Sequence, residues 1–197
     1  CTQLACATRR IKIATGIVNV FSRSPALIAQ TAGSLDLISN GRFILGLGTS
    51  GHQVIEGWHG VKFERGVRRM RETIEIVRMV LKRERVNYEG EIFHLGMGLK
   101  LITHPVRESI PIYLATLTPS GVALAGEMAD GSLPVFFSPA HSDAVIRPGY
   151  AKGADKAGRP LSGPARCPTT PAGGTGDPRA VRRATGGAPA LPAPGTG

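Results

Sequence analysis

The glycine-interrupted segment 52–60 carries the side chains best suited to acid–base chemistry. His52, Glu56 and His59 occur there at spacings of four and three residues. Imidazole and carboxylate groups in a loop beside a pocket can donate or accept a proton near neutral pH. The order H-x-x-x-E-x-x-H matches no common zinc pattern, so we expect no metal site. The segment therefore predicts polar residues that line a pocket, with His52 or Glu56 as the candidate proton relay.

A six-residue glycine pattern immediately precedes this segment. Gly46-Leu47-Gly48-Thr49-Ser50-Gly51 matches G-x-G-x-x-G and follows an apolar run, as dinucleotide-binding turns do. Such a site needs a helix to begin at the turn, with its amide groups on the pyrophosphate. Residues 52–60 contain too much glycine for a helix of useful length, and no strand ending in Asp or Glu follows about twenty residues on. We favour a close-packed loop at the carboxyl end of a strand, where active sites of α/β proteins collect.

A second loop with hydroxyl side chains follows another apolar run. Thr116 and Thr118 precede Pro119, and proline is favoured at the first position of a helix. The N-terminal amides of that helix could cradle an anion, typically phosphate. Capping of the helix by a hydroxyl, worth about 1 kcal/mol, explains the same residues without any ligand. The residues alone favour neither interpretation.

Alternating strands and helices must position these loops. The expected strands are residues 11–18, 42–48, 111–115 and 131–135, with a hairpin over residues 86–94. The expected helices are residues 25–38, a long helix from near Arg65, residues 122–128 and residues 140–157. The alternation implies a parallel sheet covered by helices, and it leaves open a doubly wound sheet or a closed barrel. The chain holds about four strand–helix units, whereas a closed barrel needs eight.

The charge distribution argues against a nucleic-acid or membrane partner. The 197 residues carry a net charge of +10, but aromatic residues make up only 5% and none interleaves with the arginines as base stacking would need. No apolar run approaches the ~20 residues that span a bilayer. We expect a solvated helix face and a small-molecule partner. The basic residues of that face are Arg65, Arg68, Arg69, Arg71, Arg78, Lys82 and Arg83.

Cysteine usage and the two ends of the chain bear on its location and extent. Cys1, Cys6 and Cys167 form no C-x-x-C pair, and no basic-then-apolar leader precedes them, which favours a reducing, cytoplasmic setting. The first residue is not Met, which indicates processing or excision from a longer chain. We expect a folded domain over residues 1–160. Residues 161–197 are rich in Gly and Pro and predict a low-complexity tail, either disordered or read in a shifted frame.

Several motifs in order make the chain resemble the luciferase-like (bacterial luciferase superfamily) F420-dependent oxidoreductases over about residues 3–160. The motifs are Ile13-Ala14-Thr15-Gly16-Ile17-Val18-Asn19-Val20, Leu37-Ile38-Ser39-Asn40-Gly41-Arg42-Phe43-Ile44-Leu45-Gly46-Leu47-Gly48, Val54-Ile55-Glu56-Gly57-Trp58-His59-Gly60 and Leu124-Ala125-Gly126-Glu127-Met128-Ala129-Asp130-Gly131.

The resemblance implies part of a (β/α)8 TIM barrel, about strands three to six. It implies hydride transfer between the deazaflavin coenzyme F420 and a small organic substrate. A homo-oligomer of the intact parent is compatible with the resemblance, but the sequence does not determine the oligomeric state. An FMN-dependent monooxygenase is the alternative, since the same superfamily fold serves both cofactors. A non-catalytic truncated fragment is the third hypothesis, because half a barrel exposes strand edges and predicts weak stability or self-association.

The resemblance also implies the residues around the cofactor. It places a bulge with a non-prolyl cis peptide at Gly16-Ile17, beside the deazaflavin ring, with Asn19 next to it. Thr49, Ser50 and His52 are expected to line the mouth of the next strand. Thr116, Leu117 and Thr118 match the loop around the cofactor tail, although family members often have Lys where this chain has Ser120.

Overall fold

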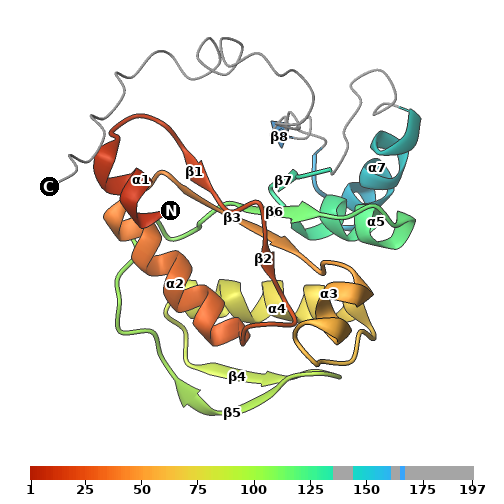
Figure 1. Ribbon diagram of the computed structural model, residues 1–197, viewed down its shortest axis with the longest axis horizontal. Helices are drawn as coiled ribbons and strands as arrows, with labels where there is room; N and C mark the ends of the chain where they lie inside the picture. The colour runs from red at the N-terminus through yellow and green to blue at the C-terminus, as the bar shows by residue number, and fades with distance from the viewer. Residues whose placement is uncertain (135–143, 161–164, 167–197) are drawn as a thin grey trace, which may run out of the picture.

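The computed structural model describes residues 1–134 and 144–160 and the backbone of residues 165–166. Six strands form one parallel sheet in which the central strand β3 (Phe43–Gly48) lies between β6 (Ile112–Ala115) and the pair β1 (Ile13–Ala14) and β2 (Val18–Asn19). The sheet continues through β7 (Gly131–Ser132) to β8 (Ala165–Arg166) (Figure 1). The expected parallel α/β sheet is confirmed.

The described helices include the four that the sequence predicts, over residues 25–38, 66–81, 119–128 and 147–156, and two that it does not predict, over residues 2–7 and 52–57. They are α1 (Thr2–Ala7), α2 (Pro25–Ile38), α3 (His52–Gly57), α4 (Gly66–Leu81), α5 (Pro119–Met128) and α7 (Arg147–Lys156), and a separate antiparallel hairpin joins β4 (Val86–Glu89) to β5 (His94–Leu99). Two of the elements that the sequence predicts extend into residues that the structure does not describe. Val135, the end of the predicted strand 131–135, and residues 140–143 of the last predicted helix lie outside the described part of the chain.

Local signals set the ends of α2. The hydroxyl of Ser24 accepts a hydrogen bond from the Leu27 amide at 3.2 Å, and Pro25 occupies the first helical position. Asn40 (φ 51°) and Gly41 (φ 74°) then reverse the chain, and the Gly41 amide donates to the carbonyl of Asp36 at 2.9 Å. The sequence stop signal at Asn40-Gly41 is therefore confirmed.

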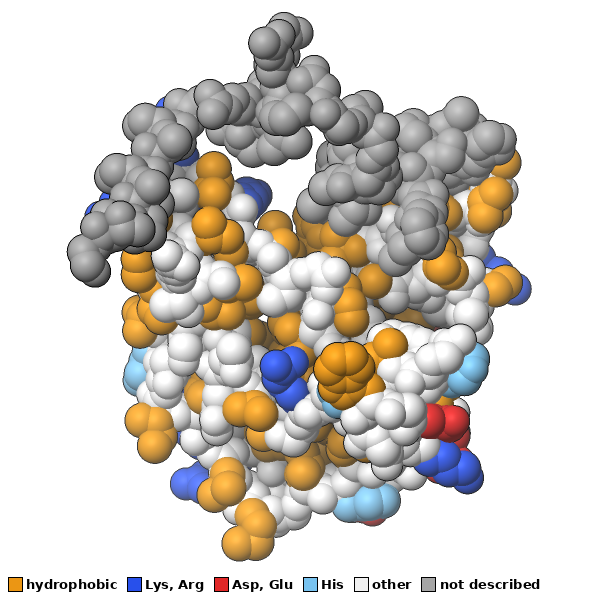
Figure 2. All heavy atoms as spheres, in the orientation of Figure 1, with side chains coloured by type: hydrophobic (Ala, Val, Ile, Leu, Met, Phe, Trp, Pro, Cys, Tyr) orange, Lys and Arg blue, Asp and Glu red, His pale blue; other side chains and the backbone are white. Residues whose placement is uncertain are grey.

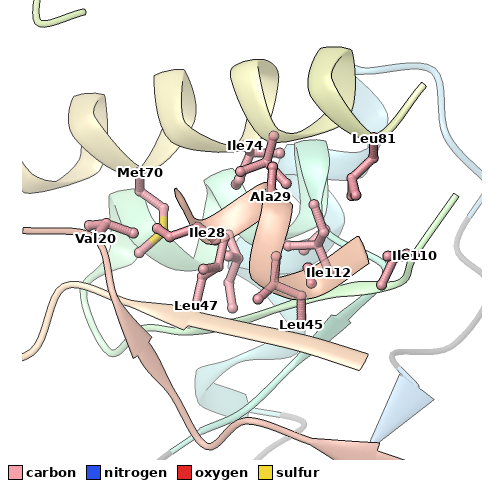
Figure 3. Packing of buried hydrophobic residues seen from close by; sticks show 14 of the residues in the cluster. Val20, Ile28, Ala29, Leu45, Leu47, Met70, Ile74, Leu81, Ile110 and Ile112 are labelled. Carbon is pink, nitrogen blue, oxygen red and sulfur yellow. The ribbon is translucent and has the colours of Figure 1, made fainter. Parts of the chain in front are cut away.

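The core lies where α2 and α4 pack on the central strands. Ile28 and Ala29 of α2, Ile74 of α4, Leu47 of β3 and Ile112 of β6 point toward one another in Figure 3, and all are 2% exposed or less. Full burial of a side chain of this size contributes about 1.5–3 kcal/mol. This packing fixes α4 over the carboxyl half of β3.

The bulge expected around Gly16-Ile17 is present. Ile13 and Ala14 pair with Phe43 and Ile44, whereas Val18 and Asn19 pair with Leu47 and Gly48, so three residues (15–17) oppose two (45–46). The extra residue breaks the predicted strand 11–18 into β1 and β2 (Figure 1).

The cis peptide expected at Gly16-Ile17 is not found, because the described residues contain no cis peptide bond. The bulge is built with trans bonds, and the Thr15 hydroxyl hydrogen-bonds to the main chain of Gly46. That part of the expectation is wrong for this structure.

Segment 52–60 also differs from its expectation. Six residues, His52–Gly57, form the short helix α3, whereas the sequence predicts a loop over this segment. Ile55 is fully buried and fixes the inner face of this helix, which outweighs the helix-breaking tendency of the glycines that follow. α3 is too short to provide the long helix that a dinucleotide-binding turn requires. Its presence therefore does not support the doubly wound fold.

The basic face of α4 is only in part the solvated surface that the sequence predicts, since Lys82 and Arg65 are exposed but other arginines have partners on neighbouring elements. Arg71 donates two hydrogen bonds to Glu127 of α5 at 2.6 and 2.8 Å, and Arg78 pairs with Asp130 at 3.6 Å. Arg69 stacks on the rings of Phe21 and Phe93, at 4.7 and 5.2 Å from their centroids. These charges face neighbouring elements, because α5 and the hairpin pack on either side of α4.

One short piece of the expected tail belongs to the sheet. Residues 165–166 pair in parallel with Gly131 and Ser132 of β7. The rest of 161–197 lies outside the described residues, so its expected disorder stays a prediction.

Candidate active site at the carboxyl ends of the strands

A cavity of about 630 Å³ opens where β3 and β6 end. Its walls come from the bulge, the ends of the two strands, the start of α3 and the first turns of α4 and α5. The lining residues are Ile17, Gly48, Thr49, Ser50, Gly51, His52, Phe63, Gly66, Val67, Met70, Leu114, Ala115, Thr116, Leu117, Thr118, Gly121 and Leu124. Parallel strands all present their carboxyl ends at the same edge, so loops far apart in sequence meet there.

Seven of the residues singled out from the sequence line this cavity. They are Ile17, Thr49, Ser50, His52, Thr116, Leu117 and Thr118. Together they place hydroxyl groups on two sides of an otherwise apolar space, with one imidazole at the start of α3.

Four residues singled out from the sequence do not line it, and one of them, His59, is exposed. Gly16 is exposed within the bulge, next to Ile17. The Asn19 side-chain oxygen accepts a hydrogen bond from the Phe21 amide at 2.7 Å, which shapes the turn that follows β2. Glu56 is exposed, and its carboxylate accepts a hydrogen bond from the Phe63 amide at 2.9 Å. Glu56 thus holds the loop after α3 rather than facing the cavity.

The sequence pattern missed the contribution of α4. Val67 and Met70 line the cavity, although the sequence predicts them only as part of the long helix that begins near Arg65. Phe63 was also missed; its ring lies 5.2 Å from the ring of Phe21, which in turn carries the Arg69 guanidinium. The order of elements was the available signal, because the first turn of a helix that follows a strand lies at that strand's carboxyl edge.

The sequence leaves open whether the loop before α5 caps the helix or contacts a ligand, and the structure is compatible with both. The Thr118 hydroxyl caps the helix by accepting a hydrogen bond from the Gly121 amide at 3.2 Å. Thr116, Thr118 and Gly121 nevertheless all line the cavity, so the positive end of the α5 dipole lies beside it. Capping and ligand contact are compatible at this loop.

Gly121 is expected to be sensitive to any side chain. A Cβ atom there would collide with the Thr116 hydroxyl and lie 2.9 Å from the Thr118 hydroxyl. We expect Gly121→Ala to displace both hydroxyls and to weaken binding of a cofactor in the cavity about tenfold, or ~1.4 kcal/mol. Titration with the cofactor measures this. The matched control is Gly57→Ala, where a Cβ would meet nothing within 4 Å, and equal affinities of the two variants would contradict the expectation.

The lining of the cavity suits a mostly apolar ring system with a polar extension. Ile17, Met70, Leu114 and Leu124 supply aliphatic surface, and the four hydroxyl side chains that line it supply donors and acceptors. Gly48 allows the side chain of Ile17 to approach the strand, since a Cβ at Gly48 would lie 2.8 Å from the Ile17 Cδ1 atom. No Asp, Glu, Lys or Arg lies among the described lining residues. A deazaflavin or flavin ring suits this lining.

Two other findings concern sites of a different kind. The described residues contain no group of three or more His, Cys, Asp or Glu side chains that could hold a metal ion. No helix within the described ranges is long and apolar enough to cross a membrane.

A parallel α/β sheet with a cofactor-sized cavity at its carboxyl edge defines the class: part of a barrel-type α/β enzyme fold with its site among the βα loops. The chain belongs to the luciferase-like monooxygenase family, whose sequence profile matches residues 1–189. The match extends 29 residues past residue 160, where the sequence pattern places the end of the folded domain.

The proteins similar to the chain include some named as coenzyme F420-dependent enzymes and others named as monooxygenases. A provisionally named coenzyme F420-dependent oxidoreductase of Mycobacterium tuberculosis is 45% identical over 144 residues, covering 68% of this chain and 42% of the relative. The coenzyme F420-dependent tetrahydromethanopterin reductase of Methanopyrus kandleri superposes with a TM-score of 0.74 at 29% identity, covering 81% of this chain and 50% of that one. Monooxygenase RslO1 of Streptomyces bottropensis superposes with a TM-score of 0.70 at 25% identity, covering 80% and 49%.

These likenesses confirm the partial (β/α)8 barrel and exclude the doubly wound alternative. The chain spans half or less of the length of each of these three proteins.

Proposed function

We propose that the protein binds coenzyme F420 in the cavity and transfers hydride between this deazaflavin and a small organic substrate. The main observation in support of this proposal is the cavity itself, in which an apolar wall meets a hydroxyl-bearing loop at the N-terminus of α5. The similarity to a deazaflavin-dependent oxidoreductase over 68% of the chain supports the choice of cofactor. When bound, the deazaflavin supplies the hydride chemistry, and the protein supplies orientation and electrostatics.

The described residues divide the work between two sides of the cavity. Ile17 and Leu114 offer aliphatic contacts for the ring, and Thr49 and Ser50 offer hydroxyls at the mouth of β3. Thr116 and Thr118, with the positive end of the α5 dipole, suit the polar, anionic part of the cofactor. The roles of these residues in cofactor binding are part of the proposal. Cofactor binding by Gly16, Asn19 and Leu117, which the resemblance implies, is also part of it.

Titration of the purified chain with oxidised coenzyme F420, followed by the change in cofactor fluorescence, tests the proposal. We expect saturable binding that the Gly121→Ala variant weakens and the Gly57→Ala control leaves unchanged. Fluorescence that responds equally in all three proteins would mean that the cavity does not hold the cofactor.

FMN-dependent monooxygenation is the second candidate, favoured by the structural similarity to a monooxygenase. The same apolar cavity accepts either ring, because no charged side chain within its described lining discriminates between them. To distinguish the two cofactors, the protein is incubated with reduced FMN or with reduced coenzyme F420 in the presence of candidate substrates, and oxygen uptake is measured. Substrate-dependent oxygen uptake with FMN alone would replace the deazaflavin proposal.

His52 is the better placed of the two candidate proton relays. It lines the cavity, whereas the Glu56 carboxylate is occupied by the Phe63 amide. If a protonated side chain assists turnover, we expect His52→Ala to lower kcat about tenfold to a hundredfold, within the range of general acid catalysis. We expect Glu56→Gln to leave kcat nearly unchanged, since an amide oxygen still accepts from Phe63. Steady-state kinetics separate the two, and a large loss in the Glu56 variant alone would reverse the assignment.

A non-catalytic fragment stays open as the third candidate, because the chain spans half or less of the relatives' length. A well-folded chain that shows neither cofactor binding nor turnover would favour the non-catalytic fragment. A cytoplasmic location is also proposed, supported by the free thiols of Cys1 and Cys6. Homo-oligomerisation of the intact protein is proposed as well, and sedimentation velocity tests it.

A further inference from the structure

In the central strand β3, the Gly46 amide donates its hydrogen bond to a side chain of the bulge and not to the backbone of the bulge. The amide of Leu45 donates to the carbonyl of Pro111 on the β6 side, so the alternate residues 44, 46 and 48 face the β1–β2 side. There the Ile44 carbonyl accepts from the Thr15 amide at 3.4 Å, and the Gly48 carbonyl accepts from the Val20 amide at 3.1 Å. Gly46 lies between them, opposite the bulge.

The Thr15 hydroxyl takes both backbone groups of Gly46. Its Oγ1 atom accepts a hydrogen bond from the Gly46 amide at 2.9 Å and donates one to the Gly46 carbonyl at 2.9 Å. A buried amide or carbonyl without a partner is costly, and here the bulge has moved the neighbouring backbone out of register. The hydroxyl therefore provides the acceptor for the Gly46 amide, whereas the Gly46 carbonyl also takes part in the parallel pairing of Val18 with Leu47.

Gly46 has no room for a side chain at this contact. A Cβ atom there would collide with the Thr15 carbonyl oxygen and lie 2.9 Å from the Leu133 side chain. The two strands thus approach closely at the position of the bulge. This close approach fixes the chain immediately before Ile17, whose side chain lines the cavity and contacts Gly48.

We propose that Thr15 is a positioning residue: its hydroxyl fixes the bulge to Gly46 and thereby holds Ile17 at the cofactor face of the cavity. This role rests on the proposed function for its effect on cofactor binding, but its structural half is independent of any ligand. Thr15 does not line the cavity and acts only through Ile17.

Two variants of Thr15 separate its hydroxyl from its shape. Thr15→Val keeps the branched side chain and removes both hydrogen bonds, whereas Thr15→Ser keeps the hydroxyl. Thr31→Val is the matched control, because Thr31 is an exposed residue of α2 away from the cavity. The readouts are amide exchange at Gly46, the methyl resonance of Ile17 and the dissociation constant for coenzyme F420.

In Thr15→Val we expect amide exchange at Gly46 about tenfold faster, a shifted Ile17 methyl resonance and a dissociation constant about tenfold higher, a change equivalent to ~1.4 kcal/mol. In Thr15→Ser we expect all three to return to within about twofold of the parent, and Thr31→Val to leave them unchanged.

Unchanged Gly46 exchange in Thr15→Val would overturn the proposal. Faster exchange with an unchanged Ile17 resonance would also overturn it, since Thr15 would then only stabilise the strand. If the parent chain binds no coenzyme F420, the function proposed above fails, while Gly46 exchange and the Ile17 resonance still decide the role of Thr15.

Discussion

Replacement of Glu72 by alanine is expected to lower the free energy of unfolding by about 3 kcal/mol, because it removes a charged acceptor from several hydrogen bonds, each worth about 1.5–3 kcal/mol when buried, and the half-buried donors regain part of this from water. The Glu72 side chain is fully buried on α4 and pairs with Arg68 at 2.7 Å. It also accepts hydrogen bonds from the amides of Glu91, Ile92 and Phe93 at 2.9–3.0 Å. The variant would leave three amides at the hairpin tip and one guanidinium without this partner.

Chemical denaturation of the purified chain measures this loss. Glu84→Ala is the control, because Glu84 is half exposed and pairs only loosely with Lys82, at 3.9 Å. We expect this control to change the free energy of unfolding by less than about 0.5 kcal/mol. A Glu72 variant as stable as the Glu84 variant would show that the hairpin does not depend on the buried carboxylate.

The same residue gives a pH dependence with a definite sign. Burial raises the pKa of Glu72, but the Arg68 guanidinium and the three amides outweigh it and hold the pKa below the ordinary value. A carboxyl group with a lowered pKa in the folded state stabilises the fold above its unfolded pKa of about 4.3, and the contribution is lost as pH falls through the folded pKa. The stability difference between the parent and Glu72→Gln should therefore shrink on acidification below pH about 4. A stability difference between the parent and Glu72→Gln that is constant from pH 7 to pH 3 would contradict this pH dependence.

Gly153→Ala is expected to separate α7 from α5 and to cost about 3 kcal/mol, at the upper end of the range for overpacking. A Cβ at Gly153 would collide with the backbone carbonyl of Ala123 on α5. Reciprocally, a Cβ at Gly126 of α5 would collide with the carbonyl of Tyr150 on α7. Backbone atoms cannot rotate away as a side chain can, so the helices themselves must move.

The consequence should reach the cavity, because the first turn of α5 contributes Thr118 and Gly121 to its wall. We expect Gly153→Ala to lower the midpoint of chemical denaturation and to weaken cofactor binding as well. Gly57→Ala serves as the control, since its Cβ would stand in open space and alanine favours a helix. Parent-like stability of the Gly153 variant would mean that α5 and α7 can shift apart without penalty.

Exposed apolar side chains bear on the expectation of self-association. Met97, Leu99 and Ile102, on β5 and just after it, are 74–88% exposed. Figure 2 shows hydrophobic side chains at the lower edge of the molecule, where the hairpin lies. An edge strand with such side chains is prone to association, and the expected association of the chain stays a prediction until its mass in solution is measured.

The sequence by itself determined the order and type of the main elements. Apolar periodicity and local signals predict them, because the causes lie within a few residues of each other: Ser24-Pro25 begins α2, Asn40-Gly41 ends it and Glu89-Gly90 turns the hairpin. Ordered motifs also predicted the family, the barrel fold and two loops that the structure brings to one cavity.

Only the tertiary structure decided which polar groups meet across the fold. Arg71 pairs with Glu127 over 56 residues, and Glu72 reaches the hairpin tip about 20 residues away, whereas the pattern predicted a solvated face. The Thr15 hydroxyl satisfies Gly46 over 31 residues, where the resemblance predicted a cis peptide. Likewise, Met70 serves both the core and the cavity. Periodicity reports which side of a helix or strand is apolar, but partners are chosen by register and packing, which depend on the whole sheet.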